Sequence, residues 1–205
     1  MSGKYDTKSR LAALNSLLEG KSSMLIDLRG NPDPDGLASA MALRTLVNAR
    51  GVNCSLACSG TVGRAENRAL VRYAGLNLRK TADVDPTQHD LIAMVDAQPG
   101  QCKRSVPDDF CRENPPEVVI DHHPIRPESR NAPFYDVRSR YGATATIIYE
   151  YLEAAGIEPD VPLATALLYG IRSDTQDFER QAKQADIDAS SALYALANKR
   201  MLGAI

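Results

Sequence analysis

Two aspartates, Asp33 and Asp35, stand in the turn-like stretch "RGNPDPDGLAS" between a short apolar segment and a run with helical spacing. Taken alone, aspartate beside proline and glycine is ordinary turn chemistry, and Asp35 could simply cap the following helix. Further polar groups follow apolar segments in the same way: Asp96 after "LIAMV", Asp121, His122 and His123 after "EVVI", and Asp174 after "LLYGIRS". This recurrence predicts that five carboxylates and two imidazoles converge in one site.

The segments around these polar groups alternate between strand and helix type. Apolar runs of strand length lie at residues 23–28, 52–58, 89–98 and 116–124. Runs with helical spacing lie at residues 8–20, 37–51 and 64–75. Strands separated by helices predict a parallel sheet with right-handed crossovers, whose ligands collect at the carboxyl ends of the strands. The aspartates and histidines are therefore expected along one edge of one sheet.

The second half of the chain is mostly helical in pattern, with helices predicted at residues 141–156, 161–174 and 183–201. The predicted fold class is α/β, a mostly parallel β-sheet flanked by helices, with a helical C-terminal portion. The length of 205 residues and a hydrophobic content of 43% predict a single domain over residues 1–205. One long stretch, residues 98–117, is rich in proline and charge and is expected to be a loop that could border the site.

Composition restricts the partners and the compartment. A formal net charge of −2 provides no overall basic field, so binding of a long duplex nucleic acid is not expected. The four cysteines lack the close pairing of zinc sites, and nothing resembles a signal peptide, which predicts a reduced cytoplasm. The apolar runs are shorter than the roughly 20 residues that a membrane span needs. The oligomeric state stays open, with a dimer among the options.

A cluster of buried carboxylates predicts a divalent cation, because unpaired buried charges cost several kcal/mol each. Oxygen ligands with a minority of imidazole suit Mn²⁺ or Mg²⁺. Four or five carboxylates exceed the needs of one ion, so two ions that share a bridging aspartate are a further option. Paired metals suit phosphoryl chemistry, in which a water is activated and the charge on phosphate is stabilised.

Four segments together resemble the DHH phosphoesterases, a family named after the triplet that stands here as Asp121, His122 and His123. The matching segments are "NPDPDGLAS", "MVDAQ", "VVIDHHP" and "GIRSDTQDF", in the order of the family and over about residues 23–180. The resemblance, which extends to RecJ-like nucleases and oligoribonucleases, implies a metal-dependent hydrolase. The expected substrate is a phosphodiester or phosphomonoester in a small nucleotide or short oligonucleotide.

The resemblance also implies a set of metal ligands. Asp33 would bind the first metal, Asp35 would bind the second, and Asp96 would bridge the two. His122 and Asp174 would complete the second site. The implied cofactor is one or two Mn²⁺ ions per chain, with Mg²⁺ as the alternative.

Other residues are implied in orientation and in phosphate binding. Asp121 would orient a neighbouring ligand, and His123 would face the scissile phosphate as a catalytic residue together with Asp96. Ser39 would help to bind phosphate near the start of a helix. Arg64 would reach a substrate phosphate, although an arginine on a solvated helix face is the commoner situation.

The sequence departs from the family at two points. Arg29 stands where the family usually has a metal-binding histidine, and arginine cannot ligate a metal. Either the first metal site is weak, or Arg29 acts there as a catalytic phosphate clamp; one Mn²⁺ per chain would favour the clamp. The chain is also expected to lack the smaller substrate-binding domain of many members: either it is reduced to the catalytic domain, or it recognises its substrate in another way. A different class of function, binding of a nucleotide, phosphate or partner protein without hydrolysis, is the alternative.

Overall fold

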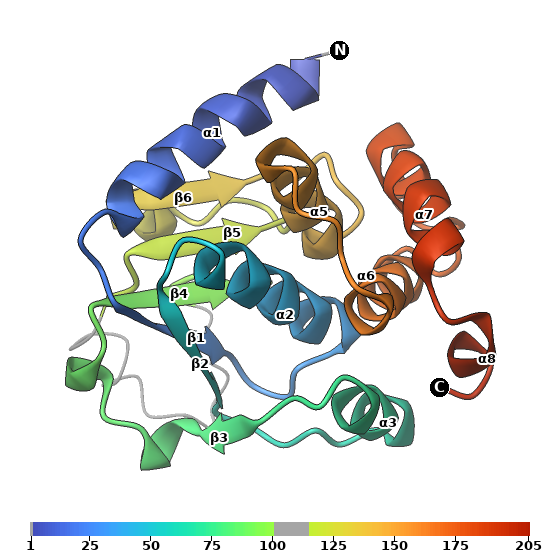
Figure 1. The fold of residues 1–205 in the computed structure, drawn as a ribbon, viewed down its shortest axis with the longest axis horizontal. Coiled ribbons are helices and arrows are strands. Elements are labelled where there is room, and N and C mark those ends of the chain that lie inside the picture. The colour runs from blue at the N-terminus through green and yellow to red at the C-terminus, as the bar shows by residue number, and fades with distance from the viewer. Residues whose placement is uncertain (1, 101–114) are drawn as a thin grey trace.

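A computed structural model describes residues 2–100 and 115–205. Its centre is a six-stranded sheet in the order β3-β2-β1-β4-β5-β6, in which every neighbouring pair is parallel (Figure 1). The strands are β1 (Ser23–Leu28), β2 (Asn53–Cys58), β3 (Leu78–Lys80), β4 (Leu91–Val95), β5 (Val118–Asp121) and β6 (Phe134–Val137). The predicted α/β class with a parallel sheet is confirmed.

The helices flank the sheet and form an additional layer toward the C-terminus (Figure 1). They are α1 (Ser2–Leu18), α2 (Pro34–Asn48), α3 (Ala65–Tyr73), α5 (Thr144–Ala155), α6 (Val161–Asp174), α7 (Gln184–Leu196) and α8 (Lys199–Leu202). Helix α2 packs on β1, β2 and β4, α5 packs on β5, and α1 packs on β6. Helix α6 packs on α2, and α7 packs on α6, which confirms the helical C-terminal portion.

Both faces of the central strand β1 are buried. Met24, Ile26 and Leu28 belong to the main core beneath the helices. Leu25, between them, belongs to a smaller cluster with Ala57, Val84 and Ile92. A strand that is covered on both faces needs apolar side chains on both of them, so its sequence is a continuous apolar run. The segment "SMLIDL" therefore indicates a strand although its polarity does not alternate.

The strand order places a topological switch point between β1 and β4. The chain continues from β1 through α2 to β2, on one side, and from β4 to β5, on the other. Loops that leave neighbouring strands in opposite directions open a crevice at their carboxyl ends, where ligands of such sheets bind. The segments that follow β1 and β4 carry Asp33 and Asp96, so the fold places these two predicted site residues at this crevice.

The structure adds two strands that the sequence did not predict. Strand β3 has three residues, of which two are exposed, and β6 has four, so neither forms an apolar run of usual length. Helix α2 begins at Pro34, three residues before the predicted start, and therefore includes Asp35 in its first turn. Most of the predicted loop at residues 98–117 lies outside the described residues. No helix in the described part of the chain is long and apolar enough to span a membrane.

Candidate metal centre and adjoining cavity

The first two aspartates are fixed by the start of helix α2. Asp33 is the N-cap, and its Oδ1 accepts a hydrogen bond from the Gly36 N–H at 2.9 Å. Pro34 occupies the first helical turn, where its missing N–H costs nothing. Asp35 then projects inward and is 1% exposed, whereas Asp33 lines a cavity. The same turn therefore sends one carboxylate into the interior and keeps the other at the surface of the crevice.

Asp35 is held by the N-terminus of a second helix. The backbone N–H groups of Thr144 and Ala145, in the first turn of α5, each donate to one carboxylate oxygen at 2.7 Å. Orphan N–H groups and the helix dipole favour an anion at this position. Burial nevertheless raises the pKa of Asp35 to about 7, because the lowering by His122 is offset by the charges of Asp174 and Asp33. The carboxylate is thus held in a fixed orientation in the interior.

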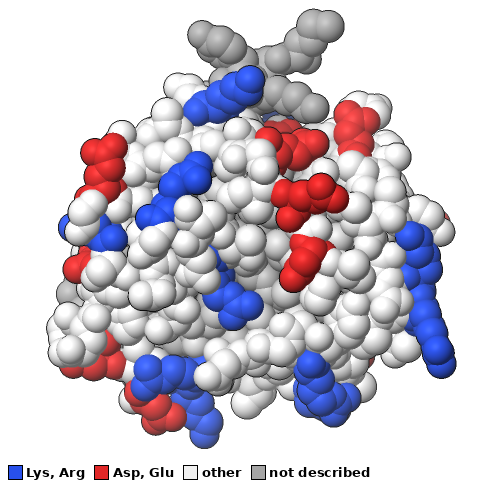
Figure 2. All heavy atoms as spheres, in the orientation of Figure 1, with Lys and Arg blue, Asp and Glu red and all other residues white. Residues whose placement is uncertain are grey.

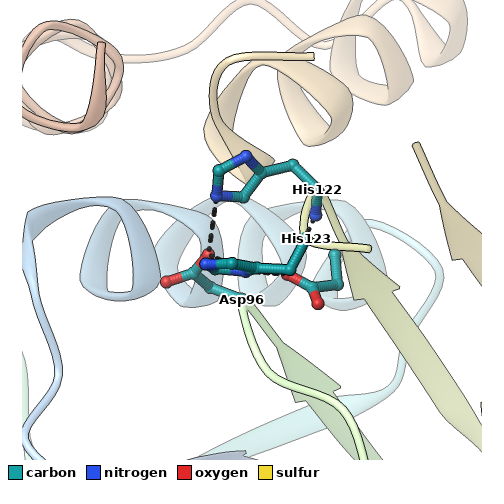
Figure 3. A group of neighbouring side chains, drawn as sticks. Asp96, His122 and His123 are labelled. Atoms are coloured by element: carbon teal, nitrogen blue, oxygen red, sulfur yellow. Dashed lines mark hydrogen bonds and ion pairs between the residues drawn. The ribbon is translucent and has the colours of Figure 1, made fainter. Parts of the chain in front are cut away.

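His122 presents one ring nitrogen to three carboxylates. Its Nδ1 lies 3.3 Å from the carbonyl oxygen of Tyr141, to which a protonated Nδ1 donates, leaving Nε2 as the inward-facing atom. Nε2 lies 3.0 Å from Asp174, 3.6 Å from Asp96 and 4.0 Å from Asp35. Figure 3 shows the imidazole pointing toward Asp96, with His123 alongside. Burial lowers the pKa of His122, but the hydrogen bond to Asp174 and the charges of Asp35, Asp174 and Asp121 outweigh it and raise the pKa to about 9.

Asp96, directly after β4, has a left-handed backbone with φ of 54°. Its N–H donates to the Ile120 carbonyl at 3.0 Å, and its Oδ1 accepts from the Thr144 hydroxyl at 3.1 Å. Burial, followed by the charges of Asp35 and Asp33, raises its pKa well above the ordinary value. Left-handed backbone in a non-glycine residue costs about 1–2 kcal/mol and is typical of functional sites. Asp96 links the two aspartates of the α2 turn to the histidines.

The ligand atoms of Asp35, His122 and Asp174 all lie within 4.8 Å of one another. Around an ion with metal–oxygen distances of about 2.1 Å, adjacent ligand atoms are about 3.0 Å apart and opposite ones about 4.2 Å. The separations of 3.0, 3.6 and 4.0 Å around Nε2 therefore suit one divalent cation after small adjustments. A cation would also neutralise carboxylates whose pKa values are raised by burial. The residues fit Mn²⁺ or Mg²⁺.

Helix α6 brings Asp174 to this cluster through a close approach to α2 at Gly170. A Cβ atom at Gly170 would lie 3.1 Å from the Pro34 carbonyl oxygen and 3.2 Å from the Asp35 Cα. Only glycine lets the helices meet at this distance without adjustment. Asp174 lies four residues farther along the same helix, on the same face. The motif "GIRSDTQDF" begins at this contact, with Gly170, and contains Asp174, the candidate ligand.

His123 contacts Asp121, and its Nδ1 also lies 3.9 Å from Asp96 Oδ1; Asp96, Asp121, His122 and His123 form a second group that could hold an ion. The Nδ1 of His123 lies 2.8 Å from Asp121 Oδ1, and the His123 side chain is 46% exposed and lines the cavity. Burial raises the pKa of Asp121, but hydrogen bonds from His123 and Gln98 outweigh it, so the pKa is lowered. The same contact from Asp121 contributes most to raising the pKa of His123. Asp121 thus contacts His123, and its orienting role stays a prediction.

The cavity next to the cluster has a volume of about 440 Å³. Its walls come from the segments after β1 and β4, with contributions from the segment after β5. The charged and imidazole side chains that line it are Arg29, Asp33, Asp96, His123 and Arg126. No phenylalanine or tyrosine lines it among the residues that the structure describes. The cavity therefore suits a small polar ligand more than a stacked base.

Arg29 lines the cavity but is tied to the sheet. Its Nε lies 2.6 Å from Asp27 Oδ2, and the two side chains are 8% and 0% exposed. Asp27 also accepts a hydrogen bond from the Thr81 hydroxyl at 3.1 Å. Burial raises the pKa of Asp27 even though the guanidinium lowers it. The clamp role of Arg29 stays a prediction.

Two of the predicted phosphate ligands lie away from the cavity lining. Ser39 is fully buried one turn after Asp35, and its hydroxyl lies 3.4 Å from the Asp35 Oδ1. Arg64 is the exposed N-cap of α3. Neither is among the described residues that line the cavity. Their roles in phosphate binding stay predictions without a contact that supports them.

Comparison with known proteins settles the family. The model of the DHH family, N-terminal domain, matches residues 24–171, which is most of the chain. The chain belongs to the DHH family. An uncharacterised protein of Methanocaldococcus jannaschii is 37% identical over 187 residues, which are 91% of this chain and 37% of that protein. A probable manganese-dependent inorganic pyrophosphatase of Bacillus licheniformis is 28% identical over 177 residues, which are 86% of this chain and 56% of that protein.

Solved structures share the fold at low sequence identity. An exopolyphosphatase-related protein from Bacteroides fragilis superposes with a TM-score of 0.69 and 13% identity, over 96% of this chain and 61% of that one. A manganese-bound exonuclease RecJ superposes with a TM-score of 0.52 and 16% identity, over 92% of this chain and 47% of that one. The chain thus spans less than two thirds of the relatives and structures that it matches.

Proposed function

We propose that the protein is a manganese-dependent hydrolase that cleaves a phosphate bond in a small anionic substrate. The observation that carries the proposal is the set of three carboxylates around one imidazole nitrogen, beside a polar cavity. Asp35, Asp96, His122 and Asp174 would hold one ion. The relatives named as manganese-dependent pyrophosphatases favour Mn²⁺ over Mg²⁺. A second ion between Asp33 and Asp96 remains part of the hypothesis, and the Mn²⁺ count per chain tests it.

Different residues of the chain would have different roles in the hydrolysis. Mn²⁺ in this position would supply Lewis-acid polarisation of phosphate and lower the pKa of a water. Asp121 holds Nδ1 of His123, so Nε2 is the ring atom left to exchange a proton with substrate in the cavity. Asp33 and Arg29 line the same cavity, and Arg29 would contribute hydrogen-bond donors to a phosphate there, because Asp27 already balances its charge. The buried carboxylates meanwhile stay fixed by α5 and α6.

Two substrate classes follow from different observations. The sequence predicts a small nucleotide or short oligonucleotide, and the fold shared with exonuclease RecJ is compatible with that. Inorganic pyrophosphate is the second candidate, supported by the names of the relatives and by a cavity lining without aromatic rings among the described residues. Figure 2 shows basic and acidic side chains interspersed on one face of the molecule, which agrees with a short substrate rather than a long polyanion.

Turnover tests the proposal. Pyrophosphate and bis-p-nitrophenyl phosphate are incubated with the protein and Mn²⁺, and Asp96→Asn is the matched control, because asparagine tolerates the left-handed backbone and removes only the charge. We expect Mn²⁺-dependent hydrolysis of at least one substrate and its loss in the variant. Mn²⁺ binding without hydrolysis of either substrate would favour the alternative, a module that binds a phosphate ligand or a partner protein without hydrolysis.

A further inference from the structure

Arg126 is a second cationic residue at the cavity, and neither the motifs nor the charge pattern singled it out. It stands in the segment after β5, three residues beyond His123, and lines the cavity together with it. The side chain is half-buried, so part of it faces the interior of the fold. A cation three residues from the imidazole that faces the substrate can reach a neighbouring group of the same ligand.

The backbone of Arg126 is fixed by one buried amide. Its N–H donates to Oε1 of Gln98 at 2.7 Å, and the same oxygen accepts from the Ser129 hydroxyl at 2.8 Å. Nε2 of Gln98 donates to Asp121 Oδ2 at 2.6 Å and to the Pro124 carbonyl at 3.1 Å. Gln98 is 0% exposed, so these four hydrogen bonds form in a low dielectric. A single side chain therefore sets the position of Arg126 relative to Asp121, which orients His123.

The guanidinium of Arg126 retains most of its hydrogen-bonding capacity. Nη1 donates to the Gly100 carbonyl at 3.0 Å, which uses one of five N–H donors. The ion pairs of arginine between described residues join Arg29 to Asp27, Arg138 to Asp136 and Glu150, and Arg172 to Asp177. None of these ion pairs involves Arg126. Arg29 thus has its charge balanced by Asp27, whereas Arg126 has no carboxylate at ion-pair distance among the described residues, although Glu128 also lies close to Gly100.

We propose that Arg126 binds a second anionic group of the substrate, next to the phosphate that would lie at Asp35, Asp96, His122 and Asp174. The inference rests on the proposed function for the place of that first phosphate. A planar guanidinium matches two phosphate oxygens at once, which gives both affinity and orientation. Arg126 is then a specificity residue: it favours ligands with two linked phosphoryl groups over ligands with one.

Binding of ligands that are not hydrolysed tests this role without relying on turnover. Imidodiphosphate and inorganic phosphate are titrated calorimetrically into the full chain, at a fixed free Mn²⁺ concentration. Arg126→Ala is compared with Arg130→Ala, which removes an exposed arginine of the same segment that does not line the cavity. We expect Arg126→Ala to weaken imidodiphosphate binding about 10- to 100-fold and phosphate binding less than about twofold. Arg126→Lys should restore part of the loss, and Arg130→Ala should change neither.

Three results would overturn the proposal. The first is an unchanged affinity of Arg126→Ala for imidodiphosphate. The second is an equal loss of affinity for imidodiphosphate and phosphate in Arg126→Ala, if this variant keeps the thermal stability of the wild type. The third is a wild-type protein that binds imidodiphosphate no more tightly than phosphate. Discrimination between the ligands without any Mn²⁺-dependent turnover would instead refute the hydrolase and leave the role of Arg126 intact. The failures of the two proposals are thereby distinguishable.

Discussion

The site has two halves that are built in different ways. The inner half, Asp35, Asp96, His122 and Asp174, is assembled by contacts between distant parts of the chain. Asp35 is held by the first turn of α5, and Asp174 reaches it because α6 approaches α2 at Gly170. The outer half, Asp33, Arg29 and His123, is held by neighbours in the sequence: Gly36, Asp27 and Asp121.

The difference suits a rigid inner half that holds a metal and an outer half whose side chains can adapt to substrate. Ligands of a metal must keep their positions to within a few tenths of an ångström, and contacts between packed helices provide that constraint. Side chains that meet substrate can be held by their own segment, because the substrate itself completes the arrangement. We therefore expect changes in the inner half to affect metal binding, and changes in the outer half to affect substrate binding or local stability.

The largest expected effect is on stability, at Arg29 in the outer half. Arg29→Ala leaves Asp27 buried and without its ion-pair partner, which should cost about 3–5 kcal/mol of unfolding free energy. Urea denaturation measures this, and the double variant with Asp27→Ala should recover part of the loss. A loss below about 1 kcal/mol would show that the buried ion pair is unimportant for folding.

A matched pair of charge removals compares the two halves directly. Asp174→Asn should weaken Mn²⁺ binding by about 100-fold, because it removes a ligand that lies 3.0 Å from His122 Nε2. Asp33→Asn should weaken it by less than about tenfold, because asparagine caps the helix equally well and the ligand set of the inner half stays complete. Calorimetric titration with Mn²⁺ measures both. Equal losses would mean that the halves do not differ in metal binding.

Gly170 tests whether helix packing positions the inner half. Gly170→Ala gains up to about 1 kcal/mol in helix propensity but overpacks the contact with α2, which costs about 1–3 kcal/mol. We expect a melting temperature lower by a few degrees and a weaker Mn²⁺ affinity. Ala164→Ser, at a buried position of the same helix away from the α2 turn, serves as a control for general damage to α6. A more stable variant with unchanged Mn²⁺ affinity would contradict the proposed packing role.

The smallest expected effect lies at the amino ends of the central strands β1 and β4, away from the site, and depends on pH. Backbone and hydroxyl donors of Ser22, followed by those of Ser23, lower the pKa of Asp90 to about 2 from an ordinary 3.8. A lowered pKa in the folded state stabilises the protein above pH 3.8 and ceases to do so as the pH falls through 2. Asp90→Asn should therefore melt slightly below the wild type at pH 6, with a difference that shrinks toward pH 2. A difference that grows on acidification would contradict the assigned hydrogen bonds.

The sequence was sufficient for the parts of the site that depend on local pattern. Strand-terminal polar residues indicated where the ligands gather, since a parallel sheet brings the carboxyl ends of its strands together. It assigned no role to Gln98, the last residue of "MVDAQ", and did not indicate Arg126, because their roles arise from hydrogen bonds between segments more than 20 residues apart. The pairing of Arg29 with Asp27 was missed because Asp27 reads as part of a buried strand.

The central claim is that the inner half binds a divalent cation. Anomalous diffraction at the manganese edge, from crystals of the full chain soaked in Mn²⁺, tests it directly. We predict a peak coordinated by Asp35, Asp96, His122 and Asp174, which would be lost in Asp174→Asn crystals. A peak found only between Asp33 and Asp96, or no peak at saturating Mn²⁺, would contradict the claim.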